Sequence, residues 1–201
     1  MTLTDQLALG NVTVSTASGL GGAGDITVNN AITYASANSL TLSANRSITV
    51  IAGSGGISNT GTGAVTLTGG GAGSIAVNES ITTGGGAIAL TSGTGGITLA
   101  ASKAIDAGAG TIAINAGGGA ANLTTGNLRT SNATASAASI SNATTLALGN
   151  VALTGGGTLS VSHSGAGSQS GGTSISGMGG LTKAGAGVLT LSQANSYTGT
   201  T

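Results

Sequence analysis

The sequence has 201 residues, of which 40 are glycine, and its four basic and four acidic residues give a formal net charge of zero. With so few cations and only two aromatic residues, both tyrosine, the chain lacks the basic clusters and stacking platforms that nucleic-acid binding needs. The absence of cysteine excludes disulfides and thiol chemistry, and no apolar run approaches the roughly 20 residues of a membrane-spanning helix.

The composition also bears on whether the chain folds. Runs of glycine and serine are typical of low-complexity segments, yet disordered chains usually combine low hydropathy with high net charge. This chain has a mean hydropathy of +0.39, and only 4% of its residues are charged. Together with the regular spacing of the aliphatic residues, these values favour a folded chain.

The first 23 residues predict an opening coil. Two short strands are expected, at residues 7–9 and 12–14, with a turn at Gly10 and Asn11 between them. The hexapeptide LALGNV of residues 7–12 returns unchanged at residues 146–151. Because the separation is close to a whole number of coil periods, we interpret the second copy as a repetition in phase with the first.

Residues 24–119 carry the strongest pattern, an aliphatic–small–aliphatic phrase that keeps returning. Each phrase has the alternation of a half-buried strand, with its outer residues on one face and its middle residue on the other. Glycine, asparagine and serine, which favour turns, lie between the phrases. The phrases are ITV at 26–28, LTL at 40–42, ITV at 48–50, VTL at 65–67, IAV at 75–77, IAL at 88–90, ITL at 97–99 and IAI at 112–114.

The aliphatic residues fall into three interleaved series with a period of about 24 residues. Three strands per period predict an all-β fold, a single-stranded, right-handed parallel β-helix (β-solenoid) in which each coil covers the core of the next. The handedness follows the preference of parallel crossover connections. At a spacing of about 4.8 Å, roughly eight coils would form a rod about 40 Å long. The three series start at Ile26, Ile48, Ile75 and Ile97; at Ile32, Ile57, Ile81, Ile105 and Leu128; and at Leu40, Val65, Ile88 and Ile112.

The pattern is less regular after residue 119. Residues 120–145 keep approximate phase but are dominated by alanine, serine, threonine and asparagine, which predicts thin packing and a protruding loop. Regular phrases resume over residues 146–161. Residues 162–180 are rich in glycine and serine and predict a long corner with one weak strand near Ile175.

The C-terminal residues 179–201 contain a spaced motif, made of GLTK at 180–183, LTL at 189–191 and NSYTG at 195–199. In this order they resemble the autotransporter-associated β-strand repeat of bacterial autotransporter passengers. The upstream coils, with phrases such as GSIAVN at 73–78, are similar to the repeats of filamentous-haemagglutinin-like secreted proteins. We therefore divide the chain into haemagglutinin-like solenoid repeats at 1–178 and a truncated autotransporter-associated repeat at 179–201 that continues the same solenoid.

This resemblance implies a structural stalk segment of a type V secretion passenger, adhesin- or haemagglutinin-like, that acts as a rigid spacer. It implies a location at the bacterial cell surface or outside the cell, and an outer-membrane translocator as a partner in the full-length protein. Surface glycans or proteins are expected to bind regions outside this segment, which itself is expected not to insert into a membrane or bind nucleic acid. The first residues lack the pattern of a signal peptide, so we expect a fragment of a longer passenger.

Charged residues are the first candidates for chemistry, because glycan-cleaving enzymes use paired carboxylates. The period instead places most of the acids beside a cation of a neighbouring coil, as expected for ladder pairs on the surface. We therefore predict no catalytic residue and no enzyme activity. The acids are Asp5, Asp25, Glu79 and Asp106, and the expected pairs are Asp25–Arg46, Glu79–Lys103 and Asp106–Arg129.

Polar side chains other than the acids also have structural interpretations. His163, the only histidine, has no cysteine or acid beside it in sequence, so it is expected at a strand end or corner and not in a metal site. The glycine runs lack the Gly-Lys-Ser/Thr ending of a phosphate-binding loop. Asn29, Asn78 and Asn115 each follow an aliphatic phrase, where amides can satisfy the backbone of a corner. We predict no metal, cofactor or cofactor-binding residue.

Two other functional classes stay open. A glycan-acting enzyme on the same scaffold would need several acids that converge on one face beside a cleft. A self-associating matrix protein or an ice-binding solenoid would use exposed strand edges or flat threonine arrays. The outward threonines form an incomplete array, since alanine replaces them at positions 76, 89 and 113.

Overall fold

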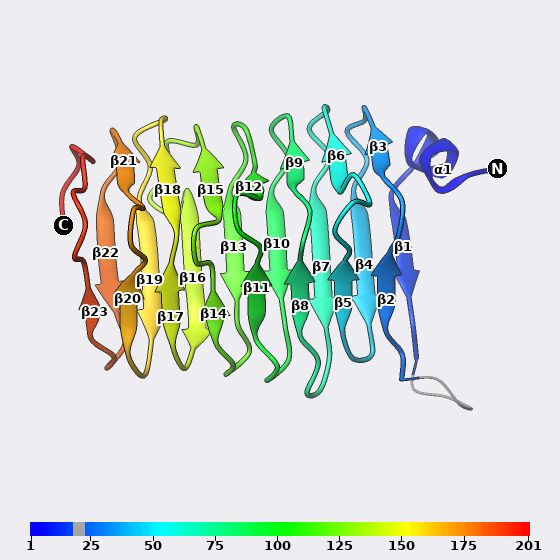
Figure 1. The fold of residues 1–201 in the computed structure, drawn as a ribbon. Helices are drawn as coiled ribbons and strands as arrows, with labels where there is room; N and C mark the ends of the chain where they lie inside the picture. The colour runs from blue at the N-terminus through cyan, green and yellow to red at the C-terminus, as the bar shows by residue number, and fades with distance from the viewer. Residues whose placement is uncertain (18–22) are drawn as a thin grey trace.

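The computed structural model describes residues 1–17 and 23–201 and arranges them as a rod of stacked coils behind a short N-terminal helix (Figure 1). Helix α1 spans Leu3–Leu9. Three parallel sheets run along the rod, and neighbouring strands of each sheet come from successive coils. The chain winds as a right-handed β-solenoid with about 24 residues and three strands per coil, which confirms the fold predicted from the period.

The strands divide among the sheets by length. The first sheet has the longest strands, of four to six residues: β1 (Val12–Ser15), β4 (Leu40–Ala44), β7 (Val65–Gly69), β10 (Ile88–Thr91), β13 (Ile112–Asn115), β16 (Ala138–Ala143), β19 (Leu159–His163) and β22 (Leu181–Ala184). The second sheet has strands of two or three residues: β2 (Ile26–Val28), β5 (Ile48–Val50), β8 (Ile75–Val77), β11 (Ile97–Leu99), β14 (Ala121–Asn122), β17 (Leu146–Leu148), β20 (Gly167–Gln169) and β23 (Leu189–Thr190). The third sheet has strands of three or four residues: β3 (Ile32–Tyr34), β6 (Ile57–Asn59), β9 (Ile81–Thr83), β12 (Ala104–Asp106), β15 (Asn127–Thr130), β18 (Asn150–Leu153) and β21 (Ile175–Gly177).

In each sheet the strand register places similar residues of successive coils next to one another. The three predicted aliphatic series are the inward columns of the three sheets, with Ile48 paired to Ile75, Ile57 to Ile81, and Val65 to Ile88. In most coils the first and third residues of each strand are buried and the middle residue is partly exposed. This alternation fixes the register, because a slip by one residue would turn every aliphatic side chain to solvent.

Glycine at the corners lets successive coils stack closely. A β-carbon on Gly73 would lie 1.7 Å from the carbonyl oxygen of Arg46 in the preceding coil, and one on Gly63 would lie 1.9 Å from that of Asn38. Both neighbours are backbone atoms that the sheets hold in place. At these positions only glycine lets one coil pack directly on the next.

The prediction of a strand at residues 7–9 was wrong, because these residues end helix α1. The helix begins with a capping box, in which the Thr2 hydroxyl accepts the Asp5 N–H at 3.2 Å and the Asp5 carboxylate accepts the Thr2 N–H at 2.7 Å. Leu7 is fully buried in the core cluster at the N-terminal end of the rod. Helix α1 therefore covers core side chains of the first coil.

The two copies of LALGNV therefore have different structures. The first copy ends α1 and enters the first sheet at Val12, while the second forms β17 and enters the third sheet at Val151. The interpretation that the copies are in phase was wrong, since equivalent residues belong to different sheets. In the second copy Leu146 pairs with Ala121 of a preceding coil, a partner that the first copy lacks. Tertiary context decides between helix and strand here.

The less regular regions continue the ladder. In residues 120–145 alanine takes aliphatic positions of the core, with Ala121 paired to Ile97 and Ala138 to Ile112, so the packing is built from small side chains as predicted. Residues 162–180 contain one strand more than predicted, β20, which starts at Gly167. That strand was missed because no aliphatic side chain marks it.

The last coil adds strands β22 and β23 to the first and second sheets. On the third side, the N–H groups of Ser196 and Thr198 donate to the carbonyl oxygens of Ile175 and Gly177 at 2.9 and 3.0 Å. Lys183 occupies the column of Val161, and its ammonium group donates to the carbonyl oxygens of Ala184 and Gly185. The boundary at residue 179 between two kinds of repeat stays a prediction.

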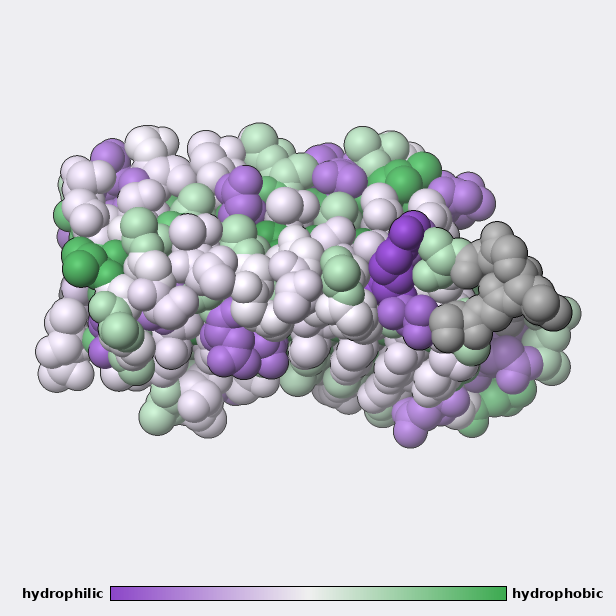
Figure 2. All heavy atoms as spheres, turned by 90° about the horizontal axis from the view of Figure 1, so that it is seen from below, coloured by the Kyte–Doolittle hydropathy of each residue, from purple (hydrophilic) through white to green (hydrophobic). Residues whose placement is uncertain are grey.

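The face at the corners that connect the first and second sheets is mostly intermediate in hydropathy, with scattered hydrophilic and hydrophobic side chains (Figure 2). Among the helices in the described ranges, none has the length and apolar character required to cross a membrane.

Candidate functional site

The charged residues form three ion pairs between neighbouring coils, as the period predicts. Arg46 and Asp25 form a bidentate pair, with 2.9 Å between Nε and Oδ1. The pairs Lys103–Glu79 and Arg129–Asp106 have N···O distances of 2.8 and 3.8 Å. Each pair joins one coil to the next, and the pairs of Lys103 and Asp106 lie at the two ends of β12.

The pair of Glu79 and Lys103 is less exposed than a surface pair is expected to be. The Glu79 side chain is 17% exposed. Its carboxylate also accepts the N–H of Gly53 at 2.8 Å, so it joins a corner of the preceding coil to Lys103 in the following one. The hydrogen bond from Lys103, and then that from Gly53, lowers the pKa of Glu79.

The Asp25 carboxyl is expected to titrate at an unusually low pH. The hydrogen bond from Arg46, and then that from the Ser47 N–H, lowers its pKa from 3.8 to about 2. Because the folded-state pKa lies below the unfolded value, the pair stabilises the fold above pH 4, and this contribution is lost as the pH falls towards 2. A carbon-13 NMR titration of the side-chain carboxyl measures the midpoint.

Two variants test whether Arg46 causes this shift in the pKa of Asp25. Arg46→Gln should return the Asp25 midpoint towards 3.8, because it removes the main partner. Lys103→Gln changes the charge of the chain equally but lies at another pair, so the midpoint should stay near 2. A normal midpoint in the unmodified protein would contradict the pairing of Asp25 with Arg46.

The acids do not converge on one face. Asp5 belongs to the capping box of α1, and the other three acids each pair with a different cation. Within residues 1–17 and 23–201, no group of three or more histidine, cysteine or acidic side chains could hold a metal ion. The arrangement thus gives ion-paired structural carboxylates rather than a pair of acids facing a common cleft.

His163 ends strand β19 and fills space inside the core, so its predicted place at a strand end is confirmed. Its Nδ1 lies 2.9 Å from the carbonyl oxygen of Gly165. The ring occupies room left by two glycines, since a β-carbon on Gly167 or Gly187 would lie less than 3 Å from it. The imidazole thus takes the place that an aliphatic side chain holds in other coils.

Inward polar side chains on the third sheet were missed from the sequence. Asn59 is 1% exposed, and its amide makes four hydrogen bonds to the backbone of Ser36, Gly61 and Gly63, at 2.9–3.1 Å. Thr83 and Thr130 likewise donate to carbonyl oxygens of corner glycines. A polar residue two positions after an aliphatic of the second series is the signal that could have identified them.

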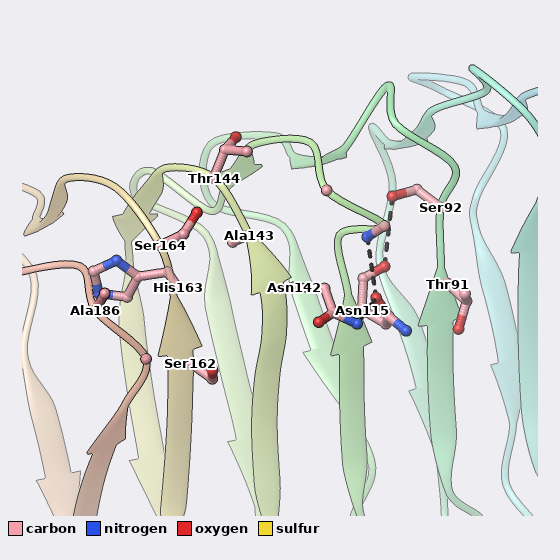
Figure 3. A pocket seen from close by; sticks show the side chains of 13 residues that line it. Thr91, Ser92, Asn115, Asn142, Ala143, Thr144, Ser162, His163, Ser164 and Ala186 are labelled. Carbon is pink, nitrogen blue, oxygen red and sulfur yellow. Dashed lines mark hydrogen bonds between the residues drawn. The ribbon is translucent and has the colours of Figure 1, made fainter.

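A groove of about 560 Å³, lined by both polar and apolar groups, crosses the corners that follow the strands of the first sheet (Figure 3). It extends from β10 across β13, β16 and β19 to the corner after β22. Glycine and alanine contribute to its lining, so little side-chain volume fills it. The polar side chains that line the groove are Thr91, Ser92, Asn115, Asn142, Thr144, Ser162, His163 and Ser164.

An irregularity in strand β16 shapes the middle of the groove. The register between β16 and β19 shifts between Ile140 and Ala143, and Asn142 has a positive φ of 52°. The Asn142 amide donates to Asn115 Oδ1 at 3.0 Å, and the same oxygen accepts the N–H of Gly117 at 3.0 Å. The corner role predicted for Asn115 is confirmed, and Asn142 is a groove residue that the sequence did not indicate.

Comparison with protein families found one match. Residues 181–201 match the family model of the passenger-associated-transport-repeat. Neither the curated proteins nor the solved structures gave a match to the chain. The matched segment contains β22 and β23 and the spaced motif described above. The chain is thus a parallel β-solenoid whose final coil is similar to the passenger-associated-transport-repeat, as in a repeat segment of an autotransporter passenger.

Proposed function

We propose that this chain is a stalk segment of a secreted or surface-displayed bacterial passenger, adhesin- or haemagglutinin-like, and acts as a rigid spacer without enzyme activity. The observation that carries the proposal is the continuous parallel ladder that runs from β1 to the repeat-like final coil. The first and second sheets each contain eight strands, and in the described residues each strand of these sheets pairs with a strand of the next coil, with one register shift in β16. The similarity of residues 181–201 supports the location outside the cell.

Rigidity follows from how the coils are joined. In each sheet the backbone hydrogen bonds run along the axis of the rod, so bending would stretch several of them at once. Inside, aliphatic columns pack coil on coil, and outside, the three ion pairs also link neighbouring coils. A chain built this way holds its ends at a fixed separation.

The test uses two introduced cysteines, since the native chain has none. Thr13→Cys and Thr182→Cys lie on β1 and β22, at equivalent outward positions at opposite ends of the first sheet. Spin labels at these sites should give one narrow distance distribution, centred near the backbone separation of about 34 Å. A broad distribution, or one centred at a much shorter distance, would contradict a rigid spacer.

The same variant tests location. When this chain is fused to the N-terminus of an outer-membrane translocator, the cysteine of Thr13→Cys should react with a membrane-impermeant maleimide on intact cells. The control is the same fusion with a core variant, Ile88→Asp, whose disrupted fold tests whether display depends on the solenoid. If the folded chain stays unlabelled until the cells are lysed, the proposed location is wrong.

A further inference from the structure

We propose that the groove across the corners of β10, β13, β16, β19 and β22 binds a neutral oligosaccharide. This function is separate from the spacer role, because a rod can hold its length with or without a ligand on its side. The groove volume of about 560 Å³ lies within the range of small-molecule sites in proteins. The groove crosses five successive coils, a length of about 19 Å that suits an extended chain of sugars.

The side chains that line the groove indicate which class of ligand it can bind. No aspartate, glutamate, lysine or arginine lines the groove, and its one ionisable side chain, His163, is buried with its Nδ1 against the carbonyl oxygen of Gly165. Anionic ligands are bound by clustered arginine and lysine, and divalent cations by carboxylates, so neither kind of ligand fits. The lining also lacks leucine, isoleucine, valine, phenylalanine, tyrosine and tryptophan side chains, which a large apolar ligand would need. A neutral ligand that carries both polar groups and small apolar faces remains.

The lining offers donors and acceptors together. Hydroxyl and amide side chains both donate and accept hydrogen bonds, which is the property that sugar hydroxyls share. Among the described residues, the hydroxyl groups of Thr91, Thr144, Ser162 and Ser164 make no hydrogen bond with protein atoms and are open to solvent. Alanine and threonine methyl groups between them give small apolar patches for the carbon faces of sugar rings.

Asn115 and Asn142 form the centre of the groove. One hydrogen bond joins them, which orients the pair and leaves Asn142 Oδ1 as an acceptor and Asn115 Nδ2 as a donor for a ligand. Figure 3 shows the two amides side by side between Ser92 and the end of β19, while the ring of His163 turns away from them. The left-handed backbone of Asn142 holds its side chain in this place.

The test is NMR mapping of the nitrogen-15-labelled chain with three neutral hexasaccharides, a β-1,4-glucan, a β-1,4-xylan and an α-1,4-glucan, and with a sulfated hexasaccharide. We expect saturable shifts of the amides of Gly117, Gly118 and Ala186 with at least one neutral probe. The double variant Thr91→Val, Ser162→Ala should bind that probe about tenfold more weakly, because it loses two hydrogen bonds. A spectrum with unchanged dispersion establishes that this variant is folded.

The matched control is Ser160→Ala, which lies two residues before Ser162 on the same outward face of β19 and outside the groove. It should keep the affinity of the unmodified chain. The proposal is overturned if no neutral probe causes shifts at millimolar concentration, or if the shifts map elsewhere. Equal affinity of the double variant, or tighter binding of the sulfated probe, would also overturn it.

Discussion

Replacing Ile88 with aspartate is expected to unfold the solenoid. Ile88 is fully buried at the centre of the first sheet, between Val65 and Ile112 of the neighbouring coils. A carboxylate there would lie among aliphatic side chains, and the buried residues of the described chain include no lysine or arginine to pair with it. An unpaired buried charge costs about 3–5 kcal/mol or more. Because each coil is stabilised by its neighbours, the loss should spread along the rod. Far-UV circular dichroism during urea unfolding measures it.

The adjacent residue provides the control for this prediction. Ala89 lies on the same strand but faces outward, beside Thr66 and Ala113. Ala89→Asp introduces the same charge in the same coil, and the midpoint of urea unfolding should change little. If both variants unfold equally, the alternation of inward and outward residues along β10 would be wrong.

Replacing Gly73 with alanine is expected to have the second-largest effect, although it adds only one methyl group. The new β-carbon would lie 1.7 Å from the carbonyl oxygen of Arg46 and 2.2 Å from its carbonyl carbon. Neither backbone atom can move without breaking the stack of coils, so we expect a loss of about 3 kcal/mol in the free energy of unfolding. Thermal unfolding followed by circular dichroism should show a clearly lower midpoint.

A second glycine distinguishes crowding from a general effect of alanine. Gly171 also lies in a corner, but a β-carbon there would have no heavy atom within 4 Å. Gly171→Ala should therefore leave the unfolding midpoint unchanged or raise it slightly, since alanine restricts the unfolded chain. A loss of stability in Gly171→Ala as large as that in Gly73→Ala would show that close stacking of the corners is not the cause.

Much of the fold could be predicted because the aliphatic residues report directly on the core. The columns through Ile48, Ile57 and Val65 followed from spacing alone, and the ion pairs followed from the same period. The N-terminal helix could not be predicted this way, because LALGNV is compatible with helix and strand. Its structure is decided by whether a preceding coil is present to supply hydrogen bonds.

The candidate groove was beyond prediction for a different reason. Its shape depends on the register shift in β16, and nothing in the spacing of alanine and serine around Asn142 marks one extra residue in a strand. Strand β20 was missed similarly, since Gly167 holds a core position that the His163 ring fills. Periodicity identifies what repeats, and these features are departures from the repeat.

The stacking of one coil directly on the next also makes the coil the natural unit of length. Inserting or removing a complete coil keeps every residue in its own sheet, so the helix at one end and the final coil at the other need no redesign. Each such step changes the reach by about 4.8 Å. Duplication of the sequence of one coil would therefore lengthen the rod while its cross-section stays the same.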